Sequence, residues 1–354
     1  MTSPRRSVTL LGLAAASVVV LAGCAATPAA GGDAGDGRIS VVASTNVYGQ
    51  IASEVGGDLV EVTSIVANES QDPHSFEPSA RDQLSVSKAD LIIENGGGYD
   101  AFIDGLIESS GTDAAVVTAV EYSHDWPENE GHADDAHADD AHADDAHADD
   151  AHADDEAAAT DSADERAEDD HDHGDHEHVD GFNEHVWYDP HTVAHVAEAI
   201  AEELGGLSPD DAETFAANAA AFAAEVEGLE ASLADIEAEH AGEQVFVTEP
   251  VPVYLVTAAG LENATPEAFS EAVEEGQDVA PATLLESLGL VRDGGVSVVI
   301  TNTQTGGAET QEIVGEAEGL GIPVIAFSET LPEGETYISW MQANIEALST
   351  ALQA

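Results

Sequence analysis

Two histidines and two glutamates lie in predicted loops where their side chains could bind a metal. His74 lies in DPHSFEPSA, after a strand-like run, and His185 lies in NEHVWYDP, just before a predicted helix. Glu249 and Glu329 end the strand-like runs VFVTEP and VIAFSE. A glutamate at a strand end is usually a turn residue, so the prediction of a metal site depends on the four residues taken together. Loops at the carboxyl ends of strands build the sites of open α/β sheets, and two imidazoles with two carboxylates suit a transition metal.

A second pair of histidines offers an alternative. The tripeptide DPH occurs again at Asp189-Pro190-His191, and His191 forms an i, i+4 pair with His195 on a predicted helix. Two histidines at this spacing can bind zinc from one helix face. The spacing leaves open whether His191 and His195 contribute to the site.

The middle of the chain carries a third concentration of ligands, the repeat HADDA over residues 132–155. Each five-residue step would turn a helix by about 140°, so the histidines form no stripe, and the segment is expected to be solvated and of low complexity. Ordering a flexible chain costs about 1–2 kcal/mol per residue, so metal binding to the repeat should be weak and exchangeable. Such weak sites would concentrate metal near the main site. The alternative is that the repeat is only an acidic solubilising insert. The histidines assigned to this secondary role are His132, His137, His142, His147, His152, His171, His173, His176 and His178.

The composition excludes some partners. The 354 residues include 72 acidic and 7 basic side chains, giving a formal net charge of -65. Nucleic acid is therefore an unsuitable partner, because phosphate contacts need Lys and Arg. Metal cations suit such a surface, although general adaptation of the surface, for example to salt, would also explain the acidity.

The N-terminus has the features of an export signal. Arg5 and Arg6 precede an apolar run over Leu10–Ala22 that is too short for a membrane span of about 20 residues. The run ends in LAGC, which resembles a bacterial lipobox, so residues 1–24 are predicted to be a lipoprotein signal peptide with Cys24 as the lipidated residue. Residues 25–38 are expected to be a flexible tether. The prediction is a lipid-anchored protein on the extracytoplasmic face of the cell membrane, with Sec or twin-arginine export left open.

The elements that must position these residues alternate between strand-like and helical patterns. This alternation predicts an α/β fold with two Rossmann-like lobes, each built on a parallel sheet. The predicted boundaries are 39–207 for the N-terminal lobe, with a loop lacking regular order at about 124–180, and 242–354 for the C-terminal lobe. Residues 208–241 are predicted to form one long helix between the lobes, and Gly96–Gly98 a tight strand-to-helix turn.

The start and face of the long helix follow from local signals. Ser208 is a candidate N-cap, Pro209 would occupy the first helical position, and Asp211 would complete a capping box. Apolar residues recur at three-and-four spacing from Phe215 to Ile236.

The segments STNVYGQIASEVGGD, DPHSFEPSA, NEHVWYDP, TEP and SETLPEGETYISWM resemble the solute-binding lipoproteins of zinc and manganese ABC importers. The resemblance implies two lobes bridged by a rigid helix, with the metal between them. Carried over by motif, His74 is the first ligand and His185, in its HxW context, the second. Glu249 matches a third position that is His in many zinc members and Glu in many manganese members. Glu329 matches a fourth position that is commonly Asp.

The predicted function is a receptor, not an enzyme, that captures a divalent transition metal and delivers it to an importer's permease and ATPase. The ligand set would accept Zn²⁺, Mn²⁺ or iron(II), and the His-rich repeat favours zinc. A surface zinc hydrolase is one alternative, although catalytic zinc usually keeps an open position. A metal-buffering or adhesin lipoprotein that acts without an importer is the other.

Overall fold

The computed structural model describes residues 37–129, 179 and 181–354. Residues 38–354 form one compact unit. The proposed lipidation site Cys24, the signal peptide and the nine histidines assigned to weak metal binding lie outside the described residues.

The first lobe contains a four-stranded parallel sheet in the order β2-β1-β3-β4. Its elements are β1 (Ile39–Thr45), α1 (Asn46–Gly56), β2 (Val60–Val66), α2 (Ala80–Val86), β3 (Leu91–Glu94), α3 (Phe102–Ser110) and β4 (Ala115–Thr118). The inner strands β1 and β3 are largely buried, as expected of a parallel sheet covered on both faces, whereas the edge strand β2 exposes Glu61. β1 lies inside the sheet, and Val41 and Val42, which point to opposite faces, are both buried.

The second lobe repeats this topology with a parallel sheet in the order β6-β5-β7-β8. Its elements are β5 (Gln244–Val247), α6 (Val253–Ala258), β6 (Glu262–Asn263), α7 (Glu267–Glu274), α8 (Pro281–Arg292), β7 (Val296–Asn302), α9 (Ala308–Leu320) and β8 (Val324–Phe327). Two parallel-sheet lobes were predicted from the sequence, and the structure confirms them.

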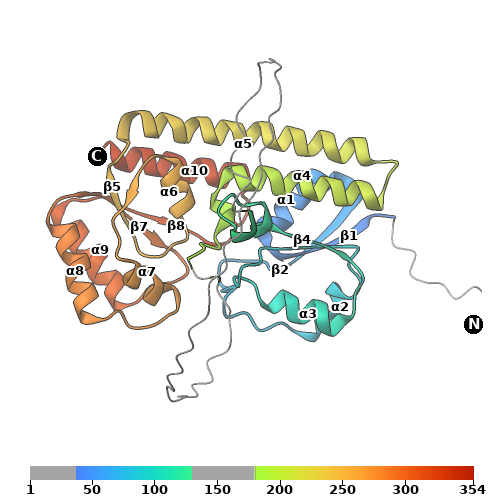
Figure 1. Cartoon of the computed structure of the whole chain (residues 1–354), viewed down its shortest axis with the longest axis horizontal. Coiled ribbons are helices and arrows are strands. Elements are labelled where there is room, and N and C mark those ends of the chain that lie inside the picture. The colour runs from blue at the N-terminus through green and yellow to red at the C-terminus, as the bar shows by residue number, and fades with distance from the viewer. Residues whose placement is uncertain (1–36, 130–178, 180) are drawn as a thin grey trace, which may run out of the picture. The chain divides into compact units, whose positions relative to one another are not determined.

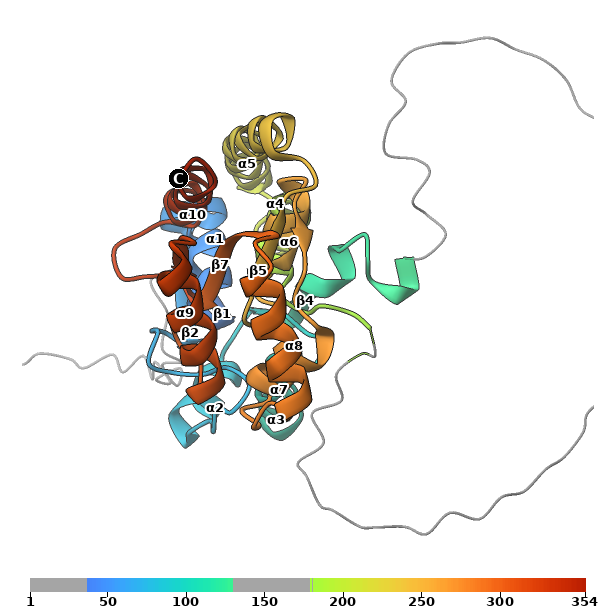
Figure 2. The ribbon, with the colours of Figure 1, turned by 90° about the vertical axis from the view of Figure 1, so that its left-hand side faces the viewer.

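Three longer helices connect and cover the lobes: α4 (Pro190–Leu207), α5 (Ala212–His240) and α10 (Tyr337–Leu352). The 29 residues of α5 correspond to about 44 Å of helix. Figure 1 shows α5 running along both lobes, and it packs against α1 and α4 toward the first lobe and against α6 and α10 toward the second. In the turned view α5 and α10 again lie on the same side of the sheets (Figure 2).

The predicted start of the long helix, with Ser208 as N-cap and Pro209 as first helical residue, is wrong by three residues, since the N-cap is Asp211 and the first helical residue is Ala212. α4 continues to Leu207, and the Ser208 backbone N–H donates to the Leu204 carbonyl, so Ser208 caps the end of α4. Its hydroxyl donates to Asp211 at 2.7 Å instead of accepting from a helix N–H, and α5 begins at Ala212. The predicted apolar face from Phe215 to Ile236 is buried.

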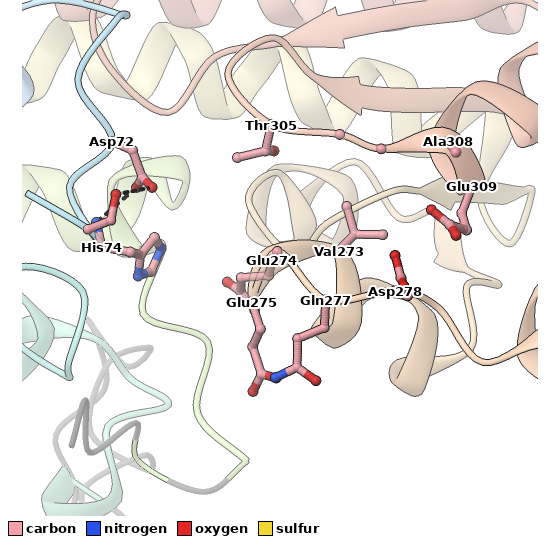
Figure 3. A pocket seen from close by; sticks show the side chains of 14 residues that line it. Asp72, His74, Val273, Glu274, Glu275, Gln277, Asp278, Thr305, Ala308 and Glu309 are labelled. Atoms are coloured by element: carbon pink, nitrogen blue, oxygen red, sulfur yellow. Dashed lines mark hydrogen bonds between the residues drawn. The ribbon is translucent and has the colours of Figure 1, made fainter. Parts of the chain in front are cut away.

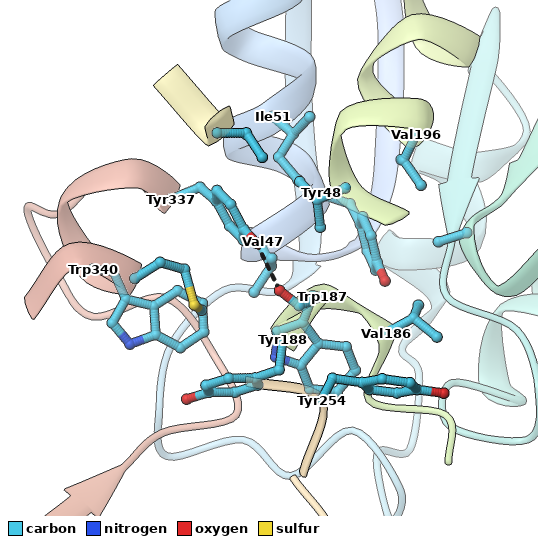
Figure 4. Packing of buried hydrophobic residues seen from close by; sticks show 14 of the residues in the cluster. Val47, Tyr48, Ile51, Val186, Trp187, Tyr188, Val196, Tyr254, Tyr337 and Trp340 are labelled. Atoms are coloured by element: carbon cyan, nitrogen blue, oxygen red, sulfur yellow. Dashed lines mark hydrogen bonds between the residues drawn. The ribbon is translucent and has the colours of Figure 1, made fainter. Parts of the chain in front are cut away.

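The largest hydrophobic cluster continues from one lobe into the other. Figure 4 shows Tyr48 and Trp187 of the first lobe packed close to Tyr337 and Trp340 of α10. The Tyr337 hydroxyl donates to the Trp187 carbonyl at 2.9 Å, and the Tyr188 hydroxyl donates to the Ser328 carbonyl at 2.7 Å. A shared core and buried hydrogen bonds therefore hold the lobes together. Among the described residues, no helix has both the length and the apolar character needed to cross a membrane.

Candidate metal centre

His74 lies in the loop after β2, and Asp72 fixes the shape of this loop. The Asp72 carboxylate accepts the His74 backbone N–H at 2.9 Å and the Ser75 hydroxyl at 2.7 Å. Such a local hydrogen-bonded turn is favoured by aspartate. Figure 3 shows the His74 ring extending from this turn toward the second lobe.

His185 is fully buried and precedes the 3₁₀ turn Val186–Tyr188. Its Nδ1 lies 2.8 Å from the side-chain oxygen of Asn183, which also accepts the His185 backbone N–H at 3.1 Å. An amide oxygen can only accept, so Nδ1 carries the proton in the neutral ring, and Nε2, which lies 3.6 Å from Glu274, is the nitrogen suited to binding a metal. The Asn183 amide donates in turn to the Pro250 carbonyl of the second lobe at 3.0 Å.

The two histidines meet a carboxylate that the sequence analysis did not identify, Glu274 at the end of α7. One ligand atom from each of His74, His185 and Glu274 lies within 4.8 Å of the others. The two imidazole centroids are 6.0 Å apart, and His185 Nε2 is 3.6 Å from Glu274 Oε1. The cluster therefore combines two imidazoles from the first lobe with a carboxylate from the second.

Glu249 and Glu329 lie on the second lobe, after β5 and β8, and are 2% and 3% exposed. The Asn302 amide, at the end of β7, donates to Glu249 at 2.9 Å and also to Glu329. The Thr305 hydroxyl donates to Glu249 as well. The structure thus brings these two predicted ligands together around Asn302, but their oxygens are not part of the compact cluster of His74, His185 and Glu274.

Burial and mutual repulsion act on these carboxyl groups in the same direction. Burial, followed by the charges of Glu184, Glu249 and Glu329, raises the pKa of Glu274 to about 9. Burial raises the pKa of Glu329 to about 8, with a further contribution from Glu249, although the Asn302 hydrogen bond lowers it. Burial also raises the pKa of Glu249. The second lobe thus concentrates carboxyl groups that a bound cation would stabilise in their charged form.

Aromatic rings orient the two imidazoles. The Tyr99 ring packs edge-on against His74 at 4.8 Å and against His185 at 5.6 Å, and Trp187 packs against His185 at 5.1 Å. Tyr99 follows the predicted turn at Gly96–Gly98, in which all three glycines have positive φ angles of 78°, 68° and 98°. Glycine suits these conformations because it has no Cβ. The tight turn that they allow places Tyr99 beside the two imidazoles.

A pocket between the lobes reaches this cluster from the surface (Figure 3). Asp72, His74 and Ser75 line its first-lobe side. The second-lobe side is formed by residues 273–278 and 305–309. His74 and Glu274 line the pocket itself, whereas His185 is fully buried. A metal would therefore meet His74 and Glu274 first.

The alternative pair, His191 and His195, lies on the exposed face of α4, with side chains 57% and 47% exposed. Neither belongs to the cluster at the pocket. Glu274 lacked any signal in the sequence, because it lies in the acidic run EAVEEGQD, where nothing separates it from Glu271 or Glu275.

Comparisons with known proteins agree with this architecture. Over 340 residues the chain is 24% identical to the manganese-binding lipoprotein MntA of Halalkalibacterium halodurans, covering 94% of this chain and 95% of that protein. It is also 24% identical to the zinc-binding lipoprotein AdcA of Streptococcus pneumoniae, covering 88% of this chain and 56% of the relative. The solved structure of the laminin-binding protein Lmb of Streptococcus agalactiae, described as a bifunctional protein with adhesin and metal-transporting activity, superposes with a TM-score of 0.63 at 22% identity, covering 89% of this chain and 99% of Lmb.

The profile of one family matches residues 41–351, nearly the whole described unit. That family comprises binding components for metal uptake, not enzymes. The chain belongs to the ZnuA family, the zinc-uptake complex component A of the periplasm.

Proposed function

We propose that this metal-uptake binding protein captures Zn²⁺ between its lobes and delivers it to an ABC importer. The observation that carries the proposal is the convergence of His74, His185 and Glu274 within 4.8 Å across the lobe boundary. A site built from two lobes on a shared core is largely preformed, so binding requires little ordering of the chain.

The donors have distinct roles in this proposal. His74 and His185 supply neutral imidazole nitrogens from the first lobe. Glu249 and Glu329 are the carboxylate ligands of the second lobe, and they reach the metal by exchanging part of their hydrogen bonding to Asn302. Glu274 faces both histidines and the pocket, so it meets the ion as it enters and adds a further carboxylate.

Zinc is the preferred cargo on chemical grounds. Imidazole suits zinc, and manganese stands at the weak end of the divalent affinity series, which rises to a maximum at copper just before zinc. Manganese is the second candidate, because carboxylates favour harder ions and the site contains three of them. Purified chain offered equal concentrations of both ions should retain zinc.

The remaining parts of the proposal concern location and transfer. Cys24 would carry the lipid that holds the protein on the extracytoplasmic face, and the partner would be the permease and ATPase of an importer. The histidines of residues 132–178 would bind zinc weakly and concentrate it near the pocket, acting through effective concentration.

Chelator competition on the purified chain tests the site. His74→Ala and His185→Ala should each remove the tight zinc equivalent while weak equivalents remain. His124→Ala is the matched control, because His124 is an exposed imidazole 3.3 Å from the carboxylate of Asp125. Unchanged tight binding in both site variants would exclude this centre as the cargo site.

A further inference from the structure

A second arrangement of imidazoles lies on the outer face of α4, apart from the pocket. The rings of His191 and His195 stand edge to face, with centroids 4.8 Å apart and planes at 85°. Both side chains are about half exposed. Their i, i+4 spacing places them one helical turn apart, where two side chains meet above the same strip of helix.

The two Nε2 atoms face each other at 3.3 Å. Two nitrogens bound to one tetrahedral zinc, at about 2.0–2.1 Å from the ion, stand about 3.3–3.4 Å apart. In a square-planar site the same bond lengths would bring adjacent nitrogens to about 2.9 Å. The observed separation therefore matches the bite of a tetrahedral ion.

The other nitrogen of each ring faces a carboxylate. His195 Nδ1 is 3.2 Å from Glu198 on the same helix, and His191 Nδ1 is 3.7 Å from Glu230 on α5. A carboxylate beside Nδ1 favours the tautomer that carries its proton there, which is the usual outer support of a zinc-bound histidine. With its proton on Nδ1, His195 directs the Nε2 lone pair at the Nε2 of His191, and a zinc ion bound by both rings would replace this nitrogen–nitrogen contact.

The helix beneath the pair is held firmly. Asp189 caps α4 by accepting the backbone N–H groups of His191 and Thr192, and Pro190 occupies the first turn. Val193 and Val196, on the opposite face, are fully buried in the core. The backbone spacing of the two histidines is thus fixed before any ion arrives.

We propose that His191 and His195 form a second transition-metal site, a two-imidazole chelate for zinc completed by water. Glu198 and Glu230 act as outer-shell partners that orient the rings. With two protein ligands and an open face, the site holds zinc more weakly than the interlobe centre and exchanges it with solvent. It stands independently of the proposed cargo site.

Histidine footprinting of the full chain tests the site without interference from other histidines. Zinc is added at increasing concentration, free imidazole nitrogens are modified with diethyl pyrocarbonate, and modification at residues 191 and 195 is read by peptide mass spectrometry. Both histidines should become protected over the same zinc range, and should still do so in the His74→Ala/His185→Ala variant.

The decisive comparison uses His195→Ala. Loss of one chelating imidazole should raise the zinc concentration that half-protects His191 by about tenfold or more. His240→Ala is the control, since His240 lies at the end of α5, where its Nδ1 is 2.9 Å from Glu243. The proposal is overturned if His191 is half-protected at the same zinc concentration in His195→Ala as in the parent chain. It is equally overturned if zinc that saturates the interlobe centre and the other histidines protects neither residue.

Discussion

Asn183 should control metal affinity without touching the metal. Its side-chain oxygen accepts the Nδ1–H of His185 at 2.8 Å and the His185 backbone N–H at 3.1 Å, and its amide donates to Pro250 of the second lobe at 3.0 Å. In Asn183→Ala the ring loses the partner that fixes its tautomer and orientation. The same change removes a hydrogen bond between the lobes.

The expected size of the effect follows from these contacts. Loss of an outer-shell partner of a metal-bound histidine typically lowers affinity by about 10–100-fold, which corresponds to about 1.4–2.7 kcal/mol. Zinc affinity measured by chelator competition should fall within this range. The number of tight equivalents should remain unchanged, because all direct ligands are present.

A matched control separates affinity from stability. Asn129 also donates to backbone carbonyls, those of Glu121 and Ser123, at 2.8 and 2.9 Å, and neither bond involves His74 or His185. Asn129→Ala should lower the melting temperature of the metal-free chain and leave zinc affinity unchanged. Equal affinity in Asn183→Ala and the parent chain would refute the reasoning that this amide sets the state of His185.

Further predictions concern charge, the pocket and the His-rich segment. Burial and then the charge of Asp100 raise the pKa of Glu94 from 4.5 to about 7, so the folded chain holds a proton that the unfolded chain has released, and stability falls as pH rises between these values. Glu94→Gln should therefore exceed the parent chain in unfolding free energy at pH 8 by at most about 3 kcal/mol, and match it near pH 4, in denaturant titrations. Glu274→Gln should weaken zinc binding in calorimetry by about tenfold or more, whereas Glu271→Gln, at an exposed position of α7 that does not line the pocket, should not. Deleting residues 131–180 should keep the tight zinc equivalent, remove the weak ones and reduce uptake only when zinc is scarce; unchanged stoichiometry and uptake would contradict the role proposed for that segment.

Much of the fold could be predicted because its signals are local. Short apolar strands alternating with helices predict parallel sheets, and the buried stripe from Phe215 to Ile236 predicts the long helix that the structure contains. The start of that helix was misplaced because Ser208 and Asp211 have the residue types of a capping box. Their side chains instead form a hydrogen bond with each other, and Ser208 caps the end of α4, which continues to Leu207.

The candidate site could be predicted only in part. His74 and His185 stand in distinctive motifs, and the structure brings them together. Glu274 depends on how α7 packs between the lobes, which no local pattern encodes. Asn302 was also missed, because an asparagine at a strand end has no special meaning until Glu249 and Glu329 are seen to bond to it.

Anomalous diffraction from crystals grown with zinc tests the central claim most directly. The proposal predicts a strong zinc peak between the lobes, bonded to His74 and His185 at about 2.0–2.1 Å and to at least one second-lobe carboxylate at about 2.0–2.2 Å. A peak bonded only to first-lobe residues, or zinc found elsewhere while the interlobe pocket stays empty, would contradict it.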